Sequence, residues 1–189
     1  MITSAAPNLA GAVALVGQIA TVGVGLVFMT AGLGKLRHRA LLPGVLANYR
    51  LLPAGLVAPL AAVLPVVELA LGGLLVSGLL SVPATALAMA LLLVFAWAMA
   101  VNLRRGRGHI DCGCGHAALR QPLAWPLVAR NVALTALLVP ALAGLPLPAG
   151  TWPLGLAGGV VLFLLFQLFN AIVALAGSPL ANARKVSVR

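Results

Sequence analysis

Apolar residues dominate the chain in long runs that short polar joints separate. Each of the five longest runs has roughly 20 residues or more, the length that an α-helix needs to cross a hydrocarbon core about 30 Å thick. Their hydrophobicity is continuous, whereas membrane β-strands alternate apolar and polar residues. The pattern therefore predicts an all-α polytopic bundle. Its five expected spans lie at about residues 9–33, 53–80, 84–103, 122–145 and 151–176.

The composition supports an integral membrane protein of one domain, residues 1–189. Hydrophobic residues make up 62% of the chain and charged residues only 7%, whereas soluble domains are about a quarter charged. The first run follows no basic segment and is too long for the apolar part of a cleaved signal peptide, so we expect it to remain as a helix. Between the first two runs, Pro43 can open a short helix, and Tyr49 and Arg50 can anchor it among the lipid headgroups.

The formal net charge of +10 comes from cations placed in the joints between apolar runs. They form no stripe with interleaved aromatic residues, so we read them as topology signals towards the lipid bilayer and not as a nucleic-acid surface. The N-terminal segment and the joints near Ser81 and Pro148 carry no Lys or Arg, whereas the other three segments carry nearly all of them. The positive-inside rule then predicts a cell-membrane protein with its N-terminus outside and its C-terminus in the cytoplasm.

The joint at about residues 104–121, which we call the Cys loop, holds both cysteines and lies on the predicted cytoplasmic side. Cys112 and Cys114 are separated by one glycine, so they can close a small, strained disulfide ring. Strained and exposed disulfides are oxidising and exchange readily. The pair is therefore our candidate catalytic dithiol, in a component of a thiol-disulfide oxidoreductase.

Two other interpretations of this loop stay open. His109, Cys112, Cys114 and His116 supply four N and S donors within eight residues, a set that zinc or copper(I) accepts, although the spacing is tighter than in structural zinc sites. Alternatively the two cysteines are incidental, and the protein is a non-catalytic assembly factor.

Polar residues inside the predicted spans form a second candidate site. Glu68 lies near the middle of the second span, where an ionisable group is costly and normally faces a partner or a cavity. Arg130 enters the fourth span from the same side, and we expect it to pair with Glu68, with Asn131 or Asn102 as hydrogen-bond support. An ion pair that holds the bundle together, a proton relay and a quinone contact are the alternatives. Separately, the GxxxG spacing of Gly155 and Gly159 permits close helix packing, within the chain or in a homodimer.

Several short motifs occur in a specific order along residues 15–145. They are AGLGKL at residues 31–36, YRLLP at 49–53, LPVVEL at 64–69, CGCG at 112–115 and RN at 130–131. Together they resemble the MauE family of methylamine utilisation membrane proteins, which is related to the DoxX-like redox-associated proteins. The resemblance implies a DoxX-like core of four antiparallel helices with an added fifth helix.

The resemblance also implies a role in maturing the disulfide-rich small subunit of methylamine dehydrogenase, or in thiol relay beside a thioredoxin-like protein. Here the CGCFG-like run of the family reads CGCGH, without the aromatic residue, which keeps the metal alternative open. Maturation of a periplasmic enzyme would require cysteines outside, but the charges place them inside. One cysteine pair also cannot carry electrons across a membrane, so a quinone, a partner's cysteines or a metal would have to complete the path.

Overall fold

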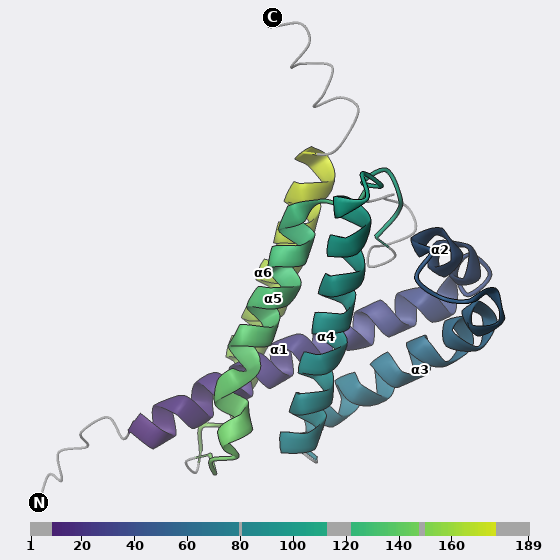
Figure 1. Ribbon diagram of the computed structural model, residues 1–189. Coiled ribbons are helices and arrows are strands. Elements are labelled where there is room, and N and C mark those ends of the chain that lie inside the picture. The colour runs from purple at the N-terminus through teal and green to yellow at the C-terminus, as the bar shows by residue number, and fades with distance from the viewer. Residues whose placement is uncertain (1–8, 80, 113–121, 148–149, 177–189) are drawn as a thin grey trace, which may run out of the picture.

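The computed structural model describes residues 9–79, 81–112, 122–147 and 150–176, which form a bundle of helices (Figure 1). The only β-structure within these ranges is an isolated bridge between Asp111 and Pro122. The elements are α1 (Leu9–Arg37), α2 (Leu42–Tyr49), α3 (Ala54–Ser77), α4 (Ser81–Arg104), α5 (Trp125–Leu138), the 3₁₀ helix η1 (Val139–Ala143) and α6 (Trp152–Ala176).

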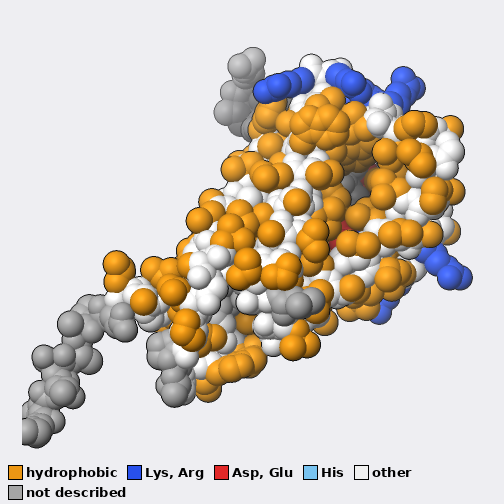
Figure 2. Space-filling view, turned by 60° about the horizontal axis from the view of Figure 1, so that its bottom comes forward, with side chains coloured by type: hydrophobic (Ala, Val, Ile, Leu, Met, Phe, Trp, Pro, Cys, Tyr) orange, Lys and Arg blue, Asp and Glu red, His pale blue; other side chains and the backbone are white. Residues whose placement is uncertain are grey.

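Among the described residues, five helical segments are long and apolar enough to cross a membrane: α1, α3, α4, α5 together with η1, and α6. The predicted all-α fold with five spans is confirmed, and the chain is a multi-pass membrane protein. Much of the surface in Figure 2 is hydrophobic, as lipid contact requires, while Lys and Arg gather at its edges. The short α2 begins with Pro43 in its first turn, as expected.

Helix α1 lies at the centre of the packing, against α3 along one side and α6 along another, while α4 pairs with α5. The start of α1, the turn between α3 and α4, and η1 lie at the lower end of the bundle in Figure 1. The opposite end carries α2, the loop after α4 and the end of α6. This arrangement places the basic joints at one end of the molecule and the uncharged joints at the other.

Glycines set the close approach of α1 to its neighbours. A Cβ atom on Gly72 of α3 would lie 2.7 Å from the Gly25 carbonyl oxygen, and one on Gly25 would lie 2.9 Å from the Gly72 oxygen. On α6, Gly155 and Gly159 face α1, where added Cβ atoms would overlap Gln18 and Val22. The GxxxG spacing is therefore used to pack two helices of the same chain.

A buried apolar core joins α1, α3, α4 and α5 in the half of the bundle away from the Cys loop. Its members include Val24, Phe28, Leu75, Ala88 and Leu138, all at most 2% exposed. A second, smaller cluster of Met99, Ile110, Cys112, Leu123 and Leu127 lies beneath the Cys loop.

Candidate functional site

A cavity of about 1540 Å³ opens between the helices at the end of the bundle that carries the Cys loop. All five long helices, α2 and the base of the Cys loop contribute to its wall. Figure 2 shows the hollow, with an acidic side chain visible inside it. The charged and amide residues of its lining include Lys35, Arg50, Glu68, Arg107, His109, Asp111, Arg130, Asn131, Gln167 and Asn170. The fold thus gathers polar side chains that lie far apart in the sequence into one space.

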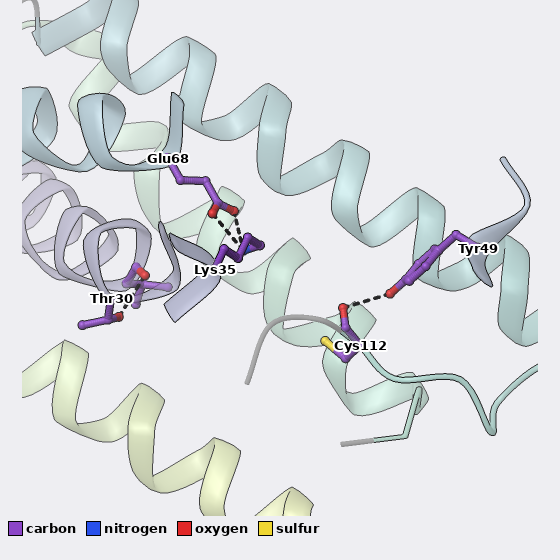
Figure 3. A network of polar contacts seen from close by, with 6 residues as sticks. Thr30, Lys35, Tyr49, Glu68 and Cys112 are labelled. Atoms are coloured by element: carbon purple, nitrogen blue, oxygen red, sulfur yellow. Dashed lines mark hydrogen bonds and ion pairs between the residues drawn. The ribbon is translucent and has the colours of Figure 1, made fainter. Parts of the chain in front are cut away.

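Glu68 forms an ion pair with Lys35, from the last turn of α1 (Figure 3). The Lys35 Nζ donates to both carboxylate oxygens at 2.8 Å. The Glu68 side chain is 1% exposed and that of Lys35 is 10% exposed. Lys35 also lies 5.8 Å from the centroid of the Phe95 ring, within range of a cation-π contact. Among the described residues, Glu68 is therefore ion-paired with Lys35, and the expected pair with Arg130, which rested on their entry from the same side, is wrong.

Arg130 lines the same cavity but contacts a different helix. Its Nη1 donates to Oδ1 of Asn170 on α6, and its guanidinium carbon lies 4.9 Å from the centroid of the Phe166 ring. Arg130 is 9% exposed and Asn131 is 4% exposed. The Nε of Arg130 and the Nδ2 of Asn131 are buried, and neither has a hydrogen-bond partner among the described residues.

The sequence analysis counted Lys35 only among the cations of the joints, and it gave no role to Gln167 and Asn170. The structure instead places all three in the cavity wall. Helix α1 continues past its apolar run to Arg37, so Lys35 lies on the helix and not in the joint. Gln167 and Asn170 are three residues apart in an otherwise apolar span, and this spacing puts them on one helix face. That spacing was the signal that could have identified them.

Cys112 lies at the base of the Cys loop and is only 5% exposed. Its Sγ donates to the Met99 sulfur at 3.9 Å, and its carbonyl oxygen accepts a hydrogen bond from the Tyr49 hydroxyl at 3.0 Å (Figure 3). Tyr49 is the last residue of α2, so this bond ties the Cys loop to the helix that follows α1. The local backbone of Cys112 is therefore held in place by tertiary contacts.

Arg107 also binds the same loop to its surroundings. Its Nη1 donates to Oδ1 of the fully buried Asn102 at 3.1 Å, and its Nη2 donates to the Asn48 carbonyl at 2.6 Å. The Leu123 amide closes the base of the loop through a 3.1 Å bond to the Ile110 carbonyl. The chain that leads into the CxC segment is thus bonded to α2, and it is bonded to the chain that leads out through the Leu123–Ile110 hydrogen bond.

The segment 113–121, with Cys114 and His116, lies outside the described residues. His109 is exposed at the cavity, and Cys112 points into the apolar cluster beneath the loop. In the part of the chain that the structure describes, no three His, Cys, Asp or Glu side chains come together as metal ligands. The four-ligand metal hypothesis needs Cys114 and His116, so it stays a prediction.

A family model described as "Methylamine utilisation protein MauE" matches residues 13–146, more than two thirds of the chain. The chain belongs to the MauE family. Its relatives named "Methylamine utilization protein MauE" include one from Paracoccus denitrificans, 44% identical over 161 residues, which cover 83% of this chain and 87% of the relative. For the protein of Paracoccus versutus the identity is 44% over 166 residues, 86% and 88% of the two chains. For that of Methylophilus methylotrophus it is 40% over 167 residues, 88% and 80%.

No solved structure shows significant similarity to this MauE-family chain. The motifs on which the resemblance was based come together at the site. Lys35, Arg50, Glu68, Arg130 and Asn131 all line the cavity, and Tyr49 bonds to Cys112 at the loop. The described residues of these motifs therefore lie around one cavity, and Tyr49 connects them to Cys112.

Proposed function

We propose that this MauE-family membrane protein exchanges disulfides with a thioredoxin-like protein through Cys112 and Cys114, as a step in methylamine utilisation. The relatives' names support the pathway. The observation that carries the thiol chemistry is the anchoring of Cys112, whose carbonyl is bonded to Tyr49 of α2 while Arg107 of the same loop is bonded to Asn48 of α2. A fixed backbone at one cysteine helps to hold the pair in a reactive geometry.

The burial of Cys112 gives the two cysteines different roles in the exchange. Thiol-disulfide exchange requires direct approach of a thiolate to the sulfur that it attacks, and a partner protein cannot reach a side chain that is 5% exposed. The partner's thiolate therefore attacks Cys114, which breaks the Cys112 to Cys114 bond and releases the Cys112 thiolate. A second thiolate of the partner then attacks the mixed disulfide, which closes the partner's own disulfide and releases the Cys114 thiolate. In the reverse direction, the Cys114 thiolate attacks the partner's disulfide, and Cys112 then attacks Cys114 and releases the reduced partner. In both directions the mixed disulfide joins the partner to Cys114.

Trapping tests this proposal directly. Cys112→Ser should accumulate a mixed disulfide with the partner through Cys114, because the resolving thiol is missing. Cys114→Ser is the matched control and should accumulate none, and the double Ser variant sets the background. The adducts are resolved by non-reducing electrophoresis of acid-quenched cells and identified by mass spectrometry. If neither single variant forms an adduct, the relay proposal fails, and if only Cys114→Ser does, the two roles are reversed.

For the orientation, we propose a cytoplasmic-membrane protein with the Cys loop inside the cell. The support is the charge distribution, since the basic joints lie together at the end of the bundle that carries this loop. A membrane-impermeant maleimide should label Cys114 of the Cys112→Ser variant only after permeabilisation. Labelling in intact cells would reverse the orientation and favour an extracytoplasmic thiol partner.

A further inference from the structure

The cavity between the helices carries more positive charge than the chain can neutralise. Its described lining has two carboxylates, Glu68 and Asp111, and five cations, which are Lys35, Arg37, Arg50, Arg107 and Arg130. The two carboxylates are the only acidic side chains of the whole sequence. Five cations against two carboxylates leave a formal excess of three positive charges, and no other side chain of the protein can offset it. The cavity therefore favours an anion from outside the chain.

Arg130 strengthens this conclusion, because it lies inside a membrane span. It is 9% exposed and comes five residues after Trp125, the first residue of α5, which is about 8 Å along the helix axis. Its contacts among the described residues are the Asn170 side-chain oxygen and the Phe166 ring, and it forms no ion pair with any of them. A guanidinium stays charged, and charged groups inside a membrane are costly unless they have a partner. An anion bound in the cavity that Arg130 lines supplies that partner.

The wall of the cavity becomes apolar with depth. Phe28 of α1, Leu92 of α4 and Phe166 of α6 contribute to it. They lie nine to twelve residues before the ends of these helices at the basic end of the bundle, which is roughly 14–18 Å along the helix axes. Arg37 is the last residue of α1, and Arg50 directly follows α2. The cavity therefore suits a ligand with a negative head and an apolar chain.

The lipid bilayer supplies molecules of this kind, and basic pockets between membrane helices are known to bind anionic lipid headgroups. The cavity of about 1540 Å³ is larger than the roughly 300–1,000 Å³ of most small-molecule sites, and Figure 2 shows it open at the surface. We infer that the cavity binds an anionic phospholipid, with its phosphate at arginines that include Arg50 and Arg130 and an acyl chain along the apolar wall. This binding involves no cysteine, so it stands or falls separately from the thiol relay.

Binding is measured by native mass spectrometry of the full-length protein in neutral detergent, titrated with three probes. Dioctanoyl phosphatidylglycerol carries an anionic head and apolar chains, dioctanoyl phosphatidylcholine has the same chains on a head without net charge, and glycerol phosphate is the anionic head alone. We expect saturable binding of phosphatidylglycerol, binding of phosphatidylcholine that is at least roughly tenfold weaker, and no saturable binding of glycerol phosphate.

Three arginine variants locate the head. Arg130→Gln removes the cation inside the span and should weaken phosphatidylglycerol binding roughly tenfold or more, the effect of losing a hydrogen bond to a charged group. Arg50→Gln, at an exposed position of the lining, should weaken it roughly threefold. Arg39→Gln is the matched control, because Arg39 is exposed at the same end of the bundle but lies outside the lining, and it should change nothing.

A second pair of variants tests whether the lipid lies inside the cavity. Ala171→Trp places a large side chain at an exposed position of the lining and should weaken phosphatidylglycerol binding roughly tenfold by steric exclusion. Ala157→Trp, at an exposed position of the same helix outside the lining, should leave it unchanged.

The inference is overturned if phosphatidylglycerol and phosphatidylcholine bind with equal affinity, or if Arg50→Gln and Arg130→Gln weaken binding no more than Arg39→Gln. Glycerol phosphate that binds as tightly as phosphatidylglycerol would assign the site to a free anion and overturn it as well. Arg50 and Ala171 are exposed, so the test does not depend on whether the Arg130 variant folds.

Discussion

Two adjacent glycines of α3 allow a sharp test of how α1 and α3 pack. At Gly72, an added Cβ would lie 2.7 Å from the Gly25 carbonyl oxygen, 2.7 Å from Met29 Cγ and 2.9 Å from the Met29 amide nitrogen. At Gly73 it would meet no atom within 4 Å. Gly72→Ala and Gly73→Ala therefore make the same chemical change in the same helix, one in a tight contact and one in open space.

Two of the three atoms near Gly72 belong to the backbone, so a rotamer change cannot relieve the overlap and the helices must separate. Overpacking of this kind costs about 1–3 kcal/mol, while alanine gains about 1 kcal/mol over glycine inside a helix. Gly72→Ala should then lower the free energy of unfolding by about 0–2 kcal/mol. Gly73→Ala keeps only the gain, so the two variants should differ by about 1–3 kcal/mol.

The difference is measured by titrating both variants and the parent protein with a denaturing detergent in mixed micelles, with helicity as the signal. Equal stability of the two alanine variants would refute the close α1–α3 contact, and so would a more stable Gly72→Ala. The same contact fixes the spacing across which Lys35 reaches Glu68, so it also supports the wall of the cavity.

Two further predictions concern the polar contacts. Lys35→Met should lower the free energy of unfolding by about 3–5 kcal/mol, because the buried Glu68 carboxylate loses its ammonium, while Lys35→Met combined with Glu68→Leu should recover most of that loss. A double variant as unstable as Lys35→Met, in the same detergent titration, would argue against the ion pair. Tyr49→Phe removes the donor to the Cys112 carbonyl, worth about 0.5–1.5 kcal/mol, and should speed amide exchange around Cys112 up to about tenfold with little change in melting temperature. Hydrogen exchange with mass spectrometry checks this, and unchanged local exchange would count against the anchor.

The sequence by itself was sufficient for the features that depend on local composition. Five apolar runs of spanning length predicted five helices, because the bilayer requires that length and requires the backbone to satisfy its own hydrogen bonds. The order of the short motifs identified the family, and the cost of a charge inside a span marked Glu68 as a residue that needs a partner. These inferences use only properties of single segments, so no knowledge of helix packing was necessary.

The tertiary structure decided which of these segments meet. The register of α1 against α3, set by glycines such as Gly25 and Gly72, brings Lys35 to Glu68, whereas entry into the spans from the same side favoured Arg130. Gly155 and Gly159 pack against α1, so the GxxxG spacing serves a contact within the chain. Cys112, which is bonded to Tyr49, lies in an apolar cluster. Each outcome depends on contacts between residues far apart in the chain, and the hydrophobicity of a run does not encode its register or its neighbour.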